Sequence, residues 1–216
     1  MNGCVIFDLD GTLIDSMGDL SAAVNHTRST EHLPPLTVKQ ISSYVGEGPY
    51  VLLQRAFADL PGADIDRLLV LYKEYYRNHM TDLTVLYPGV KEGLARLYEA
   101  GIPLAIVTNK HAEAVRFLLE KLDLTQYFQI IIGSGSGFPP KPEPGALLHI
   151  LSELKADPAA SWMVGDHFTD LESGRRAGVK RALVTWGFGN PQDEVPDFRA
   201  DHFPDLIREI KAPFLP

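Results

Sequence analysis

The chain has 216 residues, of which 45% are hydrophobic and 22% are charged, and its 20 Lys and Arg against 28 Asp and Glu give a formal net charge of −8. This composition is typical of a globular protein and excludes collagen, a long coiled coil and wholesale disorder. The acidic balance, without a block of Lys or Arg, argues against a nucleic-acid or membrane surface, because phosphate backbones are held by clustered positive charge. A small anionic substrate is allowed, since a site sets its own local field.

Cysteine use and the N-terminal residues bear on the compartment. Cys4 is the single cysteine, so neither an internal disulfide nor a cysteine-based metal cage can form. The N-terminal stretch lacks the basic and long apolar regions of a signal peptide, and no apolar run approaches the roughly 20 residues of a membrane span. We therefore expect a soluble cytoplasmic protein.

Short apolar runs rich in β-branched residues alternate with helical patterns along most of the chain. The runs at residues 4–7, 103–107, 129–132, 161–164 and 181–184 predict buried strands. Helical periodicity covers residues 90–100, 112–122, 145–154 and 171–177, with Gly101 and Gly178 just past two helix ends. This alternation predicts an α/β fold with a Rossmann-like parallel sheet and helices on both faces. Residues 213–216 are expected to form a loose tail.

One segment breaks the alternation. Residues 19–27, 38–45, 50–60 and 65–80 carry helical patterns only, separated by turn signals rich in Pro and Gly. We interpret residues 16–85 as an all-helical cap inserted into a core made of residues 1–15 and 86–216. Its two connections would let the cap move as a lid over the end of the sheet.

Polar residues follow the predicted strands, where ligands bind in an open parallel sheet. The first strand is followed by Asp8 and Asp10, the second by Thr108 and Asn109, the third by a loop carrying Lys141, and the fourth by Asp166 and Asp170. Crowded carboxylates repel one another unless a cation lies among them, and oxygen ligands without Cys or a His cluster suit Mg²⁺. Thr108 and Asn109 are expected at the head of a helix, where backbone N–H groups bind anions. Together these groups indicate phosphoryl transfer.

Four stretches also carry a family resemblance. Residues 8–16, 107–109, 139–142 and 165–170 resemble, in that order, the four motifs of the haloacid dehalogenase superfamily. The helical insert is similar to the C1-type cap of that superfamily. Within it, residues 45–56 and 185–189 look most like the phosphoglycolate phosphatase group.

The resemblance implies roles for the acidic residues. Asp8 would be the nucleophile that forms an aspartyl-phosphate, and Asp10 would protonate the leaving oxygen and then activate water. Mg²⁺ would be held by an Asp8 carboxylate oxygen, the Asp10 backbone carbonyl and Asp166, while Asp170 would support the water shell of the metal. Alternatively, Asp170 belongs to a capping box formed by residues 169–172.

The resemblance also implies a phosphate site and one departure from the family pattern. Thr108, Asn109 and Lys141 would bind the phosphoryl oxygens, and Lys141 would also neutralise Asp8. Position 167 is His, where small polar residues are common in the family, so the loop beside Asp166 is expected to differ in shape.

The cap offers candidates for substrate selection, namely Gly46, Glu47, Gly48 and Arg55. Arg55 could instead only pair with a neighbouring acid. The run of tyrosines at positions 72, 75 and 76 favours a packing face over a substrate cage.

The sequence thus predicts a Mg²⁺-dependent phosphatase of a small phosphomonoester, with 2-phosphoglycolate as the leading substrate, and it leaves the oligomeric state open. A phosphosugar mutase, or a phosphatase of a sugar phosphate, a nucleotide or pyrophosphate, is the alternative. A non-catalytic phospho-aspartate signalling switch is more remote, because receiver domains are shorter and carry no helical cap.

Overall fold

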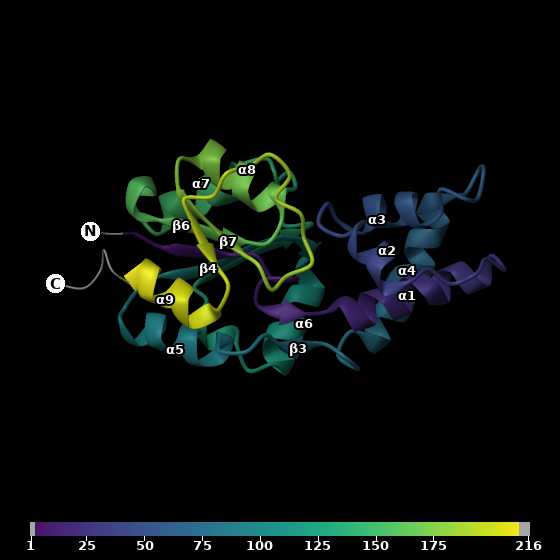
Figure 1. Cartoon of the computed structure of the whole chain (residues 1–216), viewed down its shortest axis with the longest axis horizontal. Helices are drawn as coiled ribbons and strands as arrows, with labels where there is room; N and C mark the ends of the chain where they lie inside the picture. The colour runs from purple at the N-terminus through teal and green to yellow at the C-terminus, as the bar shows by residue number, and fades with distance from the viewer. Residues whose placement is uncertain (1–2, 212–216) are drawn as a thin grey trace.

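The computed structural model describes residues 3–211, and within them a six-stranded sheet forms the centre of the larger lobe (Figure 1). The strand order is β5-β4-β1-β6-β7-β8, and all neighbours are parallel. The strands are β1 (Val5–Phe7), β4 (Leu104–His111), β5 (Ile130–Ser134), β6 (Trp162–Gly165), β7 (Lys180–Val184) and β8 (Phe198–Ala200). The predicted parallel α/β sheet is therefore confirmed. The tail predicted at residues 213–216 lies outside the described residues.

Both faces of this sheet are covered by helices, as the side-chain alternation of β1 requires. Val5 and Phe7 belong to a hydrophobic core on one face, and Cys4 and Ile6 belong to a second core on the other face. The first face is covered by α5 (Val90–Glu99), α6 (Ala112–Lys121) and α9 (Phe203–Lys211), and the second by α7 (Gly145–Glu153) and α8 (Phe168–Ala177). Two 3₁₀ turns, η1 (Thr125–Tyr127) and η2 (Pro158–Ala160), lie in the connections. Along the described chain, no helix is long and apolar enough to cross a membrane.

Four helices form the smaller lobe at one end of the molecule (Figure 1). They are α1 (Met17–Thr30), α2 (Val38–Ser42), α3 (Pro49–Ala56) and α4 (Ile65–His79). Helix α1 packs against α2 and α4, and α3 packs against α4. All four lie in the segment where the sequence predicts only helices. The assignment of residues 16–85 to a separate domain stays a prediction.

The two connections to the smaller lobe run side by side. β2 (Ile14–Asp15) pairs antiparallel with β3 (Val85–Leu86), which joins the outgoing and returning chain. Just inside the lobe, the buried Asp19 carboxylate accepts hydrogen bonds from the backbone N–H groups of Leu83 and Thr84 and from the Thr84 hydroxyl. A single carboxylate therefore ties the first turn of α1 to the returning chain.

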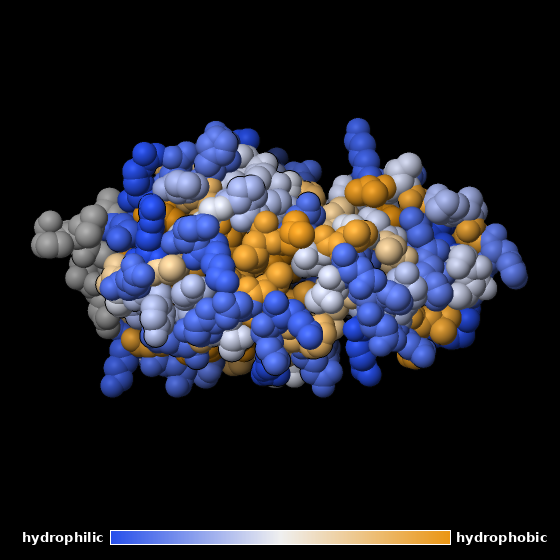
Figure 2. Space-filling view, turned by 90° about the horizontal axis from the view of Figure 1, so that it is seen from below, coloured by the Kyte–Doolittle hydropathy of each residue, from blue (hydrophilic) through white to orange (hydrophobic). Residues whose placement is uncertain are grey.

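Apolar side chains are exposed near this junction. Leu83 and Val85 are 61% and 57% exposed. Figure 2 shows hydrophobic surface gathered near the middle of one face of the molecule. The connections between the lobes are thus not uniformly covered by polar groups.

Several element boundaries differ from the sequence prediction. Helix α8 begins at Phe168, and its capping box joins His167 to Asp170, so the capping box predicted at residues 169–172 is wrong. The expected helix head at Thr108 and Asn109 is also wrong, because β4 extends to His111. These two residues therefore offer their groups from the end of a strand.

Two C-terminal elements were not predicted. β8 has three residues and lies at the sheet edge, where a short and partly exposed strand gives little hydrophobic pattern. Helix α9 buries Phe203, Leu206, Ile207 and Ile210, a spacing that does signal an amphipathic helix. Its Phe203 ring stacks on Phe7 with ring centroids 6.3 Å apart, which anchors the helix to the centre of the sheet.

Candidate active site

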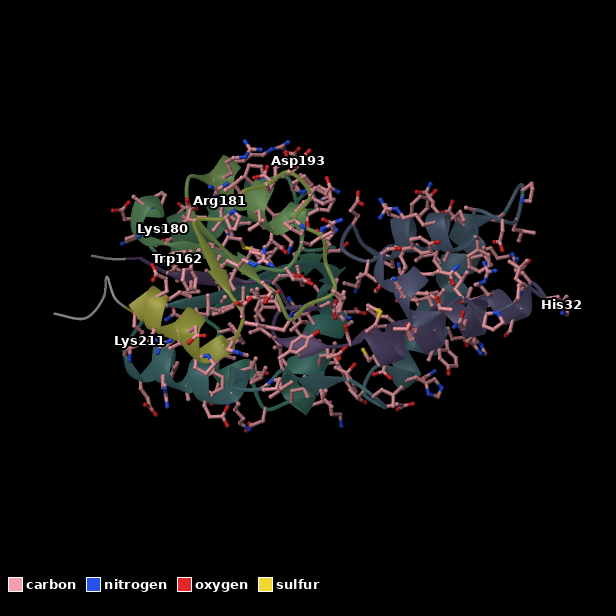
Figure 3. All side chains as sticks on the ribbon, viewed as in Figure 1. His32, Trp162, Lys180, Arg181, Asp193 and Lys211 are labelled. Carbon is pink, nitrogen blue, oxygen red and sulfur yellow. The ribbon has the colours of Figure 1, made fainter. Side chains whose placement is uncertain are left out.

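The predicted site residues gather at the end of the sheet that faces the smaller lobe. Trp162 and Lys180 begin β6 and β7, and Figure 3 places both at the end of the molecule away from that lobe. The carboxyl ends of the parallel strands therefore point toward α1 to α4. This is the edge at which open α/β sheets bind ligands.

Three carboxylates and one ammonium group form the centre of this edge. Asp8, Asp166 and Asp170 each offer an oxygen within 4.8 Å of the others, and all three residues are buried. Lys141 Nζ lies 2.8 Å from Asp8 Oδ1 and 2.5 Å from Asp170 Oδ1, and it donates to the Val107 carbonyl at 2.9 Å. Four groups from three distant parts of the sequence thus meet in one charged cluster.

Burial controls the protonation of this cluster. It raises the pKa of Asp8 to about 6, although Lys141 opposes the shift. Burial, followed by the charges of Asp170 and Asp8, also raises the pKa of Asp166 well above its usual range. The pKa of Lys141 is lowered by burial but raised more by Asp170 and Asp8, so it lies above its usual value. Three acids against one lysine leave excess negative charge, which a cation would stabilise.

Close backbone packing orients Asp166. Its Oδ2 accepts hydrogen bonds from the backbone N–H groups of Phe188 at 2.9 Å and Gly189 at 2.7 Å. A Cβ atom on Gly11 would lie 2.1 Å from this oxygen, and one on Gly187 would lie 2.3 Å from it. The two glycines therefore allow the loops after β1 and β7 to close around one carboxylate.

The donor set fits a hard divalent cation. Both oxygens of Asp170 are engaged, because Oδ1 accepts from Lys141 and Oδ2 accepts from the His167 backbone N–H. Within residues 3–211, no hydrogen-bond donor reaches Asp8 Oδ2 or Asp166 Oδ1. Two carboxylate oxygens from different strands are thus free to bind a metal, and oxygen ligands are those that Mg²⁺ prefers. Because both Asp170 oxygens already accept hydrogen bonds, Asp170 is better suited to supporting the metal site than to coordinating the metal directly.

Thr108 and Asn109 are both at the cluster, but their side chains differ in availability. The Thr108 hydroxyl is buried beside the cavity and accepts from the Lys110 backbone N–H at 3.3 Å, so its own hydrogen can serve a ligand. The Asn109 amide donates to the carbonyls of Gly46 and Lys141 and accepts from the Lys141 backbone N–H. Asn109 thus braces Lys141 and the cap loop, and its predicted contact with phosphate stays a prediction.

Asp10 lies beside the acidic cluster with its own partners. Ser16 Oγ donates to Asp10 Oδ1 at 2.6 Å, and Lys110 Nζ lies 3.0 Å from each carboxylate oxygen. Lys110 also donates to the Tyr76 hydroxyl of α4 at 2.6 Å. The predicted acid/base residue is therefore held from the core and, through Lys110, linked to the smaller lobe.

A cavity of about 590 Å³ separates the sheet edge from the smaller lobe. Its lining includes Asp8, Asp10, Thr108, Lys110 and Asp166 from the core and Leu20, Val45, Leu52, Tyr72, Tyr76 and Met80 from the cap helices and loops. A lining that combines charged groups at the sheet edge with many apolar side chains is typical of a small-molecule site.

The cap candidates divide into two pairs. Gly46 and Gly48 line the cavity. Glu47 and Arg55 form an ion pair at 2.5 Å, and Arg55 donates to the Tyr44 carbonyl, while neither side chain lines the cavity among the described residues. Of the two interpretations of Arg55 offered by the sequence, substrate selection or pairing with a neighbouring acid, the arrangement corresponds to the second.

His167 shapes the contact between the core and the cap loop. A Cβ atom on Gly46 would lie 2.6 Å from the His167 ring, so only glycine fits there. The ring Nδ1 lies 3.0 Å from Thr169 Oγ1, and burial lowers the pKa of His167 to about 4. The imidazole is thus neutral near pH 7, and its role here is to pack against Gly46 rather than to supply charge.

Sequence reasoning missed three parts of the site. Lys110 directly follows Thr108 and Asn109 at the end of a strand, and this position could have identified it as a site residue. The contacts of Tyr76, and of the backbone at Phe188 with Asp166, depend on tertiary packing that no local pattern shows. Tyr72 and Tyr76 are buried, as a packing face requires, yet both also line the cavity.

Comparisons with known proteins agree with this geometry. The sequence profile of haloacid dehalogenase-like hydrolases matches residues 5–184. A phosphoglycolate phosphatase of Agrobacterium fabrum is 40% identical over 207 residues, which cover 93% of this chain and 89% of that protein. One from Neisseria meningitidis is 37% identical and covers 96% of this chain and 93% of its own length.

Solved structures show the same architecture. The crystal structure of a predicted phosphoglycolate phosphatase from Haemophilus somnus superposes with a TM-score of 0.90 at 28% identity, covering 95% of this chain and 96% of that chain. The fold, the cluster at the strand ends and the named relatives all point to the same family. The chain is a phosphomonoester hydrolase that belongs to the haloacid dehalogenase-like hydrolase family.

Proposed function

We propose that the protein is a Mg²⁺-dependent phosphatase that hydrolyses 2-phosphoglycolate through an aspartyl-phosphate on Asp8. The observation that carries the proposal is the cluster of Asp8, Asp166 and Lys141, in which a buried carboxylate lies between an ammonium group and a second acid. Catalysis of phosphoryl transfer depends mainly on positioning and charge neutralisation, and this cluster supplies both.

In the first step, an Asp8 carboxylate oxygen attacks the phosphorus atom, and the bond from phosphorus to the ester oxygen breaks. Asp10 gives its proton to the leaving oxygen, so that the alcohol departs neutral. Lys141 and the Thr108 hydroxyl bind phosphoryl oxygens and keep the phosphorus in line with Asp8. When bound, Mg²⁺ would neutralise the charge shared by the Asp8 carboxylate and the phosphate.

In the second step, water attacks the phosphorus of the aspartyl-phosphate, and Asp10 accepts a proton from this water. The bond from phosphorus to Asp8 then breaks, which releases inorganic phosphate and restores the carboxylate. The contact of Asp10 with Ser16 and Lys110 keeps its carboxylate beside the reacting bond in both steps. Asp170 accepts a hydrogen bond from Lys141 and so helps to hold this lysine beside Asp8.

Two observations favour a small phosphomonoester. Relatives at 40% and 37% identity are named phosphoglycolate phosphatase. The cavity lies under the helical lobe, which would hinder the access of large phosphorylated partners such as proteins. Its volume of about 590 Å³ exceeds that of a two-carbon ester, so we expect the cap to close further around the bound substrate.

The test is kcat/KM for phosphate release from 2-phosphoglycolate beside sugar phosphates, nucleotides and pyrophosphate, each measured with Mg²⁺. We expect a strong preference for 2-phosphoglycolate and loss of activity when EDTA is added. A preference for another ester would retain the mechanism and overturn the substrate. Full activity in EDTA would overturn the metal requirement.

A further inference from the structure

Lys110 is a buried ammonium group whose role in the proposed chemistry is limited to holding Asp10. Its side chain is 6% exposed, and it lines the cavity between the lobes. Nζ contacts both oxygens of Asp10 at 3.0 Å and the Tyr76 hydroxyl at 2.6 Å. A lysine in this position keeps a positive charge at the point where the proposed leaving group departs.

The Tyr76 hydroxyl adds a donor at the same place. Because this oxygen accepts a hydrogen bond from Lys110, its own hydrogen is left for another acceptor, and none of residues 3–211 provides one. Burial and the nearby charge of Asp10 raise the pKa of Tyr76 well above its usual value, so the phenol stays protonated. Tyr76 is 7% exposed and lines the cavity, where a buried donor without a partner is costly.

We propose that Lys110 and Tyr76 form the subsite for a carboxylate group of the substrate. This inference rests on the proposed phosphatase function and adds the class of leaving group that the site selects. The two side chains together offer an ammonium group and a phenol hydrogen, which match the two oxygens of a carboxylate.

The position of Lys110 sets the distance between phosphate and carboxylate. Asp10 must reach the ester oxygen in order to protonate it, and Lys110 touches the Asp10 carboxylate. An anion that binds Lys110 therefore lies only a few bonds beyond the ester oxygen. In 2-phosphoglycolate a single CH₂ separates that oxygen from the carboxylate carbon. The subsite thus fits 2-phosphonooxy carboxylates and disfavours esters whose second charge is more distant.

Other cations at the site are less suited to this role. Lys141 lies beside Asp8, where the proposed mechanism assigns it to the phosphoryl oxygens. Lys73 and Arg77 of α4 also line the cavity, but on its solvent-accessible side, since Lys73 is an exposed residue. Among the described lysines, Lys110 is therefore the one that is buried, lines the cavity and contacts Asp10.

The experiment compares 2-phosphoglycolate with ethyl phosphate, in which a methyl group replaces the carboxylate. For each enzyme we take the ratio of the two kcat/KM values, so that a general loss of Asp10 function cancels. Lys110→Met is expected to lower this ratio by on the order of 10²-fold, because a buried charge pair with the substrate is lost. Tyr76→Phe should lower it by about 3- to 10-fold. The matched control Lys39→Met, at an exposed position of α2 outside the cavity lining, should keep it within about twofold.

Three outcomes separate the inference from the function on which it rests. If both substrates lose activity equally in Lys110→Met, Lys110 only positions Asp10 and the subsite is overturned. If the wild-type enzyme has no preference for 2-phosphoglycolate over ethyl phosphate, the proposed substrate is overturned, and the carboxylate subsite is overturned with it. If Lys110→Met does not fold, Tyr76→Phe decides by the same ratio, and an unchanged inhibition constant for inorganic phosphate shows that its phosphate site is intact.

Discussion

Asp8 carries a stability cost that depends on pH when the metal is removed. Burial raises its folded-state pKa to about 6, whereas an unfolded Asp titrates near 3.9. Between these values the folded chain holds a proton that the unfolded chain has released. Its contribution to stability is therefore present at low pH and is lost as pH rises from about 4 to about 6.

We expect this contribution to appear as a difference between wild type and Asp8→Asn in EDTA. Between about pH 4 and 6, the free energy of unfolding of wild type should fall relative to the variant by on the order of 2 kcal/mol. Urea denaturation across this pH range measures it, and the variant controls for the other titrating groups. Parallel curves for the two proteins would show that Asp8 titrates normally.

Asp10 is predicted to transfer protons during catalysis and to contribute little to the stability of the fold. Asp10→Asn keeps the shape of the side chain but removes the acid, so we expect kcat to fall by about 10²- to 10⁴-fold. Inhibition by inorganic phosphate should change little, because Thr108 and Lys141 are untouched. Asp15→Asn is the control, since among residues 3–211 the Asp15 carboxylate accepts only from the Met17 backbone N–H, and it is not part of the described cavity lining. An unchanged kcat in Asp10→Asn would remove its proposed role.

At the scale of elements, the stability of the junction depends on Asp19. Asp19→Ala leaves the buried donors of Leu83 and Thr84 without their acceptor, so we expect a loss of about 2–4 kcal/mol in the free energy of unfolding. Urea denaturation measures this loss. Asp66→Ala, at an exposed position in the first turn of α4, should cost about 0.5 kcal/mol. Equal losses in the two variants would mean that the carboxylate does not hold the junction.

For the whole molecule, metal binding should add to the stability of the folded state. A ligand at 100 times its Kd stabilises by about 2.7 kcal/mol, which for a chain of this length is roughly 5–10 °C in Tm. We expect saturating Mg²⁺ to raise the Tm accordingly and Asp166→Asn to abolish the rise. Asp193→Asn, at an exposed loop position marked in Figure 3, should retain it. A full shift in Asp166→Asn would locate the metal elsewhere.

How far the sequence predicts the molecule depends on how local each signal is. The buried strands were predictable, because runs such as residues 4–7 are apolar throughout, and the acids after them lie at adjacent strand ends. The edge strand β8 was not, since it is short and half-exposed. Lys110 directly follows Asn109 in the sequence, but its contact with Tyr76 depends on how α4 lies over the sheet edge. The roles of these residues in catalysis stay predictions until they are tested.

The central place of β1 has a consequence for synthesis on the ribosome. Val5 is translated long before its neighbours in the sheet, which are Leu104 and Trp162. The contacts of α1 to α4, in contrast, lie close together in sequence, so this segment can become helical early. Strand β1 must therefore wait without a sheet partner until translation reaches β4. Its second neighbour is added only when translation reaches β6, and the sheet is complete only after β7 and β8 have followed.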